Sequence, residues 1–112
     1  MNMTWLISFD IKTAGVETEK HLIVQADCLA MAEHGVKQMG ATWWPELQQD
    51  EGEHWWCFDQ GEVWFSAITL LEDVEFSILR GLGFLSLWQV SETPDGVIVR
   101  DEFGHCWQDY RR

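Results

Sequence analysis

Basic residues are scarce in this sequence. Seven Lys and Arg stand against 19 Asp and Glu, which gives a formal net charge of −12. No Lys or Arg occurs between Lys37 and Arg80, an interval that contains nine acidic residues. A surface of this sign repels nucleic acid and anionic lipid and attracts basic proteins and cations. We therefore expect neither nucleic-acid binding nor membrane association.

Long apolar runs and close cysteine pairs are also missing. No run approaches the roughly 20 residues of a transmembrane helix, and the first residues lack the basic flank of a signal peptide. Cys28, Cys57 and Cys106 are scattered, which argues against a disulfide framework and for a reducing compartment. These features predict a cytoplasmic protein.

Hydrophobic residues make up 46% of the 112 positions, enough for the core of one domain, so we expect residues 1–112 to form a single globular domain. Period-two alternation predicts strands at residues 4–12 and 20–26, joined by a loose loop around Gly15. Helical periodicity predicts a helix at about 28–39, capped by Asp27 and ended by Gly40.

The second half repeats this arrangement without repeating its residues. Residues 54–58 and 62–71 read as a hairpin closed by 59–61, and a shorter helix should start at Glu72 and Asp73 and stop near Arg80. Strands follow at 84–90 and 97–101, with a turn at 92–96. The predicted order is ββαββαββ, an α+β fold with a mostly antiparallel sheet of about six strands and two helices on one face.

Tryptophan, by contrast, is abundant. Five of the eight tryptophans fall between Trp43 and Trp64, together with six acidic residues and no basic one. Trp5 and Trp88 are in register with inward-pointing neighbours and should be core. Trp55 and Trp56 are consecutive in a strand, so at most one joins the core, and the other lies on the second face, where Trp64 could also stand.

An aromatic ring set among carboxylates suits a cationic ligand, because the ring face attracts arginine and carboxylates steer basic partners in. We therefore predict a non-enzymatic acidic binding protein for a basic protein, of the inhibitor or immunity type. The predicted binding surface consists of Trp43, Trp44, Glu46, Asp50, Glu51, Glu53, His54, Trp55, Trp56 and Trp64.

Three alternatives stay open. The tryptophans could wall a pocket for an organic cation or aromatic ligand. The apolar hairpin at 54–71 could form a homodimer. A small hydrolase could use a pair such as Glu62 and Glu75 with His54, although no local catalytic signature supports it.

A metal site is not expected. His54 and Cys57 form an H-x-x-C pair, and His105 and Cys106 are adjacent. On strands, both pairs point to opposite faces, so four zinc ligands do not converge simply. We predict no metal and no cofactor, with the cysteines acting as small apolar residues.

Overall fold

A long hairpin forms the centre of the sheet. The computed structural model describes residues 2–50, 52, 54–83 and 85–107, and its first elements are β1, Met3–Thr13, and β2, Val16–Ala26. Thr13 pairs with Val16, so the connection is a two-residue turn in which Ala14 and Gly15 have φ values of 51° and 79°. Such a turn matches the right-handed twist of the flanking strands.

The predicted loose loop between these strands is therefore wrong. The second strand begins at Val16 rather than near Lys20, because the polar segment from Glu17 onward pairs through its backbone with β1. Its side chains are exposed and carry no apolar alternation, so the pattern gave no sign of a strand there.

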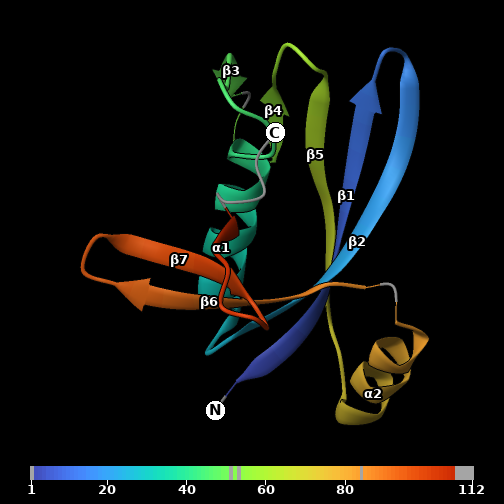
Figure 1. Ribbon diagram of the computed structural model, residues 1–112, viewed down its shortest axis with the longest axis vertical. Coiled ribbons are helices and arrows are strands. Elements are labelled where there is room, and N and C mark those ends of the chain that lie inside the picture. Colours follow the sequence, from blue (N-terminus) through green and yellow to red (C-terminus); the bar gives the residue numbers. More distant parts are fainter. Residues whose placement is uncertain (1, 51, 53, 84, 108–112) are drawn as a thin grey trace.

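Around this hairpin the chain forms one curled sheet of order β3-β4-β5-β1-β2-β6-β7 (Figure 1). Neighbouring strands are antiparallel except β2 and β6, which are parallel. The outer strands are β3 (Gln49–Asp50), β4 (Trp55–Cys57), β5 (Glu62–Leu70), β6 (Leu87–Thr93) and β7 (Gly96–Asp101).

The α+β class is confirmed, but the strand count and order differ from the prediction. The described residues form seven strands in the order ββαβββαββ, because Gln49 and Asp50, in the predicted loop, pair with Cys57 and Trp56. Two residues are too few to show any periodicity, so backbone pairing alone defines this strand.

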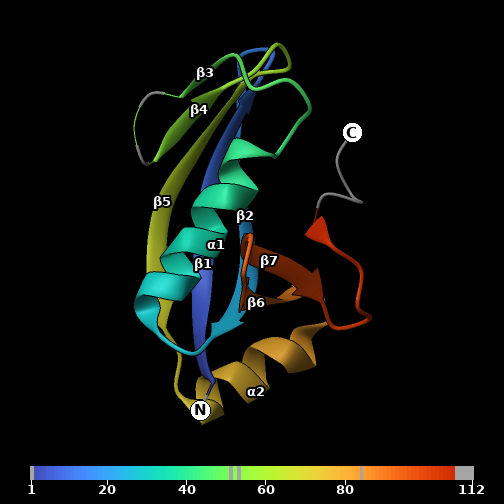
Figure 2. The same ribbon diagram turned by 90° about the vertical axis from the view of Figure 1, so that its left-hand side faces the viewer.

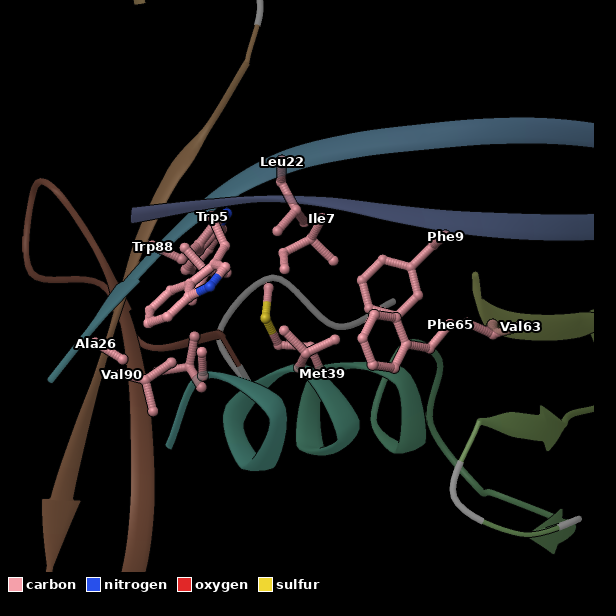
Figure 3. Packing of buried hydrophobic residues seen from close by; sticks show 14 of the residues in the cluster. Trp5, Ile7, Phe9, Leu22, Ala26, Met39, Val63, Phe65, Trp88 and Val90 are labelled. Carbon is pink, nitrogen blue, oxygen red and sulfur yellow. The ribbon is translucent and has the colours of Figure 1, made fainter. Parts of the chain in front are cut away.

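One helix, α1 (Leu29–Ala41), fills the concave side of the sheet. It contacts strands from β4, next to the edge strand β3, to β7 at the opposite edge, and β6 and β7 turn toward it (Figures 1 and 2). Between helix and sheet lies the apolar core shown in Figure 3. Trp5 and Trp88 belong to this core, as predicted. Other members include Ile7, Phe9, Leu22, Met39, Val63, Phe65 and Val90.

The prediction that Gly40 ends helix α1 is wrong. The helix continues to Ala41, its N-cap is Cys28 rather than Asp27, and Gly40 is buried inside it. A Cβ on Gly40 would overlap the ring of Trp56, and one on Gly35 would overlap the side chain of Val90. These glycines let α1 approach β4 and β6 closely, so packing, and not helix termination, explains them.

The second helix, α2 (Asp73–Leu82), was predicted on the same face as α1, and this is wrong. Helix α2 lies on the other side of β1 and β2 from α1, beyond the end of β5 (Figures 1 and 2). None of its residues is buried. The apolar side chains of Val74, Ile78 and Leu82 are 55–69% exposed. Helical periodicity shows that a helix has an apolar stripe but not what that stripe faces.

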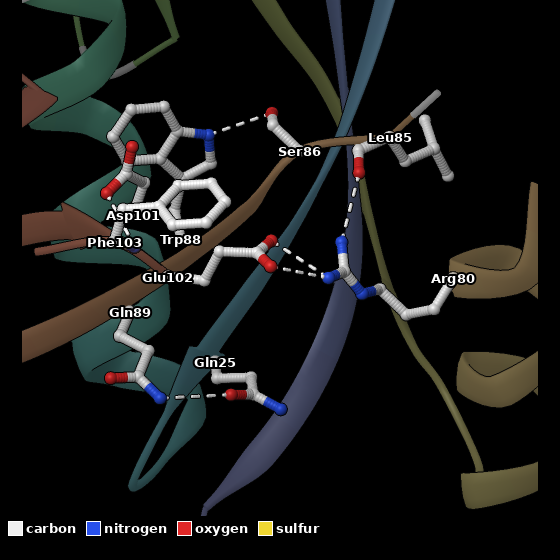
Figure 4. A network of polar contacts seen from close by, with 9 residues as sticks. All are labelled: Gln25, Arg80, Leu85, Ser86, Trp88, Gln89, Asp101, Glu102 and Phe103. Carbon is white, nitrogen blue, oxygen red and sulfur yellow. Dashed lines mark hydrogen bonds and ion pairs between the residues drawn. The ribbon is translucent and has the colours of Figure 1, made fainter. Parts of the chain in front are cut away.

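Hydrogen bonds hold α2 at both ends. At the start, Glu72 and Glu75 form a reciprocal capping box. Near the end, the Arg80 guanidinium donates to the Leu85 carbonyl oxygen at 3.3 Å and to both Glu102 carboxylate oxygens at 2.8 and 2.9 Å (Figure 4).

No helix in the described part of the chain is long and apolar enough to cross a membrane.

Candidate functional site

The sheet surface opposite α1, here called the outer face, carries most of the unusual side chains. Strand register places alternate residues of four neighbouring strands on it. They are Ser8, Asp10 and Lys12 of β1, Glu17, Glu19 and His21 of β2, Glu62 and Trp64 of β5, and Trp55 and Cys57 of β4.

A stacked tryptophan pair dominates this face. Trp55 and Trp64 are partners across the β4–β5 register, with ring centroids 4.3 Å apart and planes only 10° from parallel. Trp55 Nε1 donates a hydrogen bond of 3.0 Å to Glu62 Oε1, which holds the Trp55 ring in place. Trp64 is 39% exposed, so part of an ordered aromatic surface is open to solvent.

Beside Trp64 lies a groove of about 310 Å³. Three carboxylates and one ammonium line it, those of Asp10, Glu17, Glu62 and Lys12, so its formal charge is 1 − 3 = −2. Ser66 contributes a hydroxyl to the same wall. The arrangement combines an indole with an excess of negative charge, which suits a cationic group.

The tryptophans of the predicted surface are divided by the fold. Trp56 is 2% exposed and belongs to the core, so it is not available at the surface, whereas Trp55 joins Trp64 on the second face, as expected for consecutive strand residues. Trp43 and Trp44 are half-buried. Their rings lie against core aromatics, Trp43 at 4.9 Å from Phe9 and Trp44 at 5.5 Å from Phe58.

The polar residues of the predicted surface do not join the stacked pair. Asp50 pairs with Trp56 and lines a cavity with Lys37 of α1, which places it on the α1 side. The His54 ring lies 5.4 Å from the core residue Phe65, on that same side. Glu46 is exposed in the loop after α1. Glu51 and Glu53 lie outside the described residues.

The residues of the hydrolase alternative are not brought together. Glu62 is on the outer face and His54 on the α1 side, while the Glu75 carboxylate accepts the backbone N–H of Glu72 at the start of α2. In the part of the chain that the structure describes, no three His, Cys, Asp or Glu side chains cluster closely enough to hold a metal ion.

A constellation that sequence reasoning missed also lies on the outer face. Ser8 Oγ is 2.9 Å from His21 Nδ1, and His21 Nε2 is 2.8 Å from Glu19 Oε1. The hairpin register would have revealed it. A two-residue turn at Ala14 and Gly15 pairs Thr13 with Val16, and counting back along both strands from that pair brings Ser8 opposite His21. The loose loop that the sequence suggested concealed this pairing.

Comparison of the chain with models of protein families, with curated proteins and with solved structures finds no match.

Proposed function

We propose that this chain is a binding protein whose outer face docks an arginine-bearing segment of a basic protein, as an inhibitor or immunity-type protein would. The observation that carries the proposal is the stacked pair of Trp55 and Trp64 beside the acidic groove. The proposal replaces the broader predicted surface with this narrower one.

Two physical effects support an arginine as the contact. A guanidinium over an indole face gains roughly 0.5–2 kcal/mol, and carboxylates at the rim can accept its N–H groups in pairs. The Trp55 hydrogen bond to Glu62 keeps the stack ordered before the partner arrives, which lowers the entropy lost on binding. The net charge of −12 would also speed the encounter with a basic partner.

Nucleic acid does not suit this surface. Platforms for single strands use stacking aromatics as well, but they need basic side chains to follow the phosphate backbone. The groove offers one lysine against three carboxylates.

The test uses two fluorescently labelled peptides of equal charge, one rich in arginine and one rich in lysine, titrated with the intact protein and followed by anisotropy. We expect the arginine peptide to bind more tightly, and Trp64→Ala to weaken it about 2- to 30-fold, the equivalent of the cation–π energy. Phe103→Ala is the matched control, because Phe103 is a 78% exposed aromatic in another part of the chain.

A charge variant separates the groove from the overall charge. Asp10→Asn with Glu17→Gln should weaken arginine-peptide binding more than Glu92→Gln with Asp95→Asn, which removes the same charge from exposed positions of the β6–β7 hairpin. Equal binding of both peptides, together with no effect of Trp64→Ala, would show only non-specific attraction and would refute the proposal.

A second candidate is a receptor for a small organic cation. The groove volume of about 310 Å³ supports it, because small-molecule sites start near roughly 300 Å³. Tetramethylammonium and arginine amide, titrated while the indole N–H signals are followed by heteronuclear NMR, would then give saturable shifts of the Trp64 signal. A linear, unsaturated response to both compounds would exclude the small-molecule receptor and would not affect the peptide-docking proposal.

A further inference from the structure

We propose that Ser8 is an activated nucleophile that accepts an acyl group from an ester, with His21 as its base and Glu19 as the residue that orients His21. The inference rests on side chains that the binding proposal does not use, so it stands or falls separately.

Hydrogen-bond distances link the three groups in a chain. A carboxylate can only accept, so the His21 Nε2 that lies 2.8 Å from Glu19 Oε1 carries the hydrogen. In the neutral tautomer that carries this hydrogen, the lone pair is on Nδ1, 2.9 Å from Ser8 Oγ, where it can accept the serine hydroxyl. A hydroxyl bonded to a base that a third group orients is the general arrangement of nucleophilic catalysis.

The backbone holds these side chains in place. Ser8 and His21 face each other across the β1–β2 pairing, and Glu19 is two residues from His21 on the same face. Strand β1 is also paired with β5 at Ser8, whereas β6 pairs with β2 only from Ile23 to Gln25. Sites built on paired strands are positioned more accurately than sites on loops. The constellation therefore does not depend on a flexible segment.

The sheet is irregular beside Ser8. The pairing of β1 with β5 shifts between Ser8 and Phe9, and bulges of this kind often lie next to active sites. At this point the Ser66 hydroxyl donates to the Ser8 carbonyl oxygen at 3.2 Å. Ser66 also lines the groove beside Trp64, so the groove reaches the strand position next to the nucleophile.

The expected step is an acyl transfer. Ser8 Oγ attacks the ester carbonyl carbon and its proton passes to His21 Nδ1. The bond from the carbonyl carbon to the leaving oxygen breaks, and the leaving group departs as an alcohol or phenol with that proton. Water, deprotonated by His21, can then cleave the Ser8 ester to release a carboxylic acid and regenerate the hydroxyl.

The experiment treats the intact protein with p-nitrophenyl acetate and follows release of p-nitrophenol, while peptide mass spectrometry locates the acetyl group. We expect acetylation of Ser8, and a loss of at least about 10²-fold in the Ser8 rate in His21→Gln, the usual contribution of a general base. Ser77→Ala and Ser91→Ala are the controls, because both serines are exposed and should leave that rate unchanged.

The role of Glu19 needs a readout that a merely structural residue would not move. Glu19→Gln should slow acetylation of Ser8, and Glu19→Asp should restore part of the rate, with unchanged circular dichroism in both variants.

An alkyl fluorophosphonate gives a second probe: Oγ bonds to phosphorus, fluoride leaves, and the stable adduct remains on Ser8 even if the acetyl ester hydrolyses quickly. Labelling confined to lysines, or equal labelling of Ser8 in wild type and His21→Gln, would overturn the proposal.

Discussion

Residues without a side chain decide where the tryptophans lie. Gly40 leaves room for the ring of Trp56 against α1, so that Trp56 fills the core and its neighbour Trp55 must point to the outer face. Gly35 does the same for Val90 of β6. A single missing Cβ on the helix thus contributes to the placement of the aromatic pair on the opposite surface.

A test at this scale compares two glycines that both lie inside helices. Gly40→Ala should lower the free energy of unfolding by about 1–3 kcal/mol, the usual cost of overpacking, because its Cβ meets the Trp56 ring. Gly81→Ala in α2 meets nothing within 4 Å and should stabilise by about 0.4–1 kcal/mol. Urea denaturation measures both; equal effects would show that Gly40 is not a packing residue.

At the scale of elements, the two helices differ in what they contribute. Helix α1 buries five of its residues against the sheet, whereas α2 buries none and is held by its capping box and by the Arg80–Glu102 ion pair. A helix of ten residues is marginal in water by itself, so these end contacts matter more for α2 than its apolar stripe does.

The same substitution in two elements tests this difference. Ile7→Ala in β1 removes a fully buried side chain and should cost about 2–5 kcal/mol. Ile78→Ala in α2, at 61% exposure, should change stability by no more than about 0.5 kcal/mol. A large loss at Ile78 would mean that the stripe is covered in solution, and sedimentation at matched concentration would then show whether a second copy covers it.

For the whole molecule, charge is the dominant property. A net charge of −12 on 112 residues destabilises the compact state by self-repulsion and attracts basic partners at the same time. The two effects respond to salt in opposite ways, since screening relieves the repulsion but weakens the attraction.

Raising the ionic strength from about 0.01 M to about 0.15 M shortens the screening length from about 30 Å to about 8 Å. We expect the melting temperature to rise over this range while the affinity for the arginine-rich peptide falls. Differential scanning calorimetry and anisotropy measure the two quantities. A melting temperature that falls with salt would contradict the prediction.

Much of the fold could be predicted from local signals: alternation, turn residues and an acidic helix start. Residues 4–12 lie within β1, the hairpin at 54–71 contains β4 and β5, and the acidic start of α2 was placed at Glu72 and Asp73. Two features could not be predicted. The pairing of Gln49 with Cys57 involves a strand too short to show a period, and the position of α2 is not encoded in its helical periodicity.

The candidate site was predicted only in part, because strand geometry can be read from the sequence but packing and register cannot. That Trp55 and Trp56 must diverge follows from strand geometry, but the choice of Trp55 for the outer face depended on packing against Gly40. Of the three carboxylates beside Trp64, Glu62 is its near neighbour on β5, whereas Asp10 and Glu17 come from β1 and β2, because register across the sheet brings them there.

The sequence by itself determined the α+β class, the net charge, the abundance of tryptophan and the period of most elements, since each is a property of composition or of neighbouring residues. Only the tertiary structure decided which tryptophans face solvent, that α2 lies away from α1, and that Ser8, His21 and Glu19 form one hydrogen-bond chain. These outcomes depend on strand register and close packing, which are set by contacts across the sheet that no local pattern encodes.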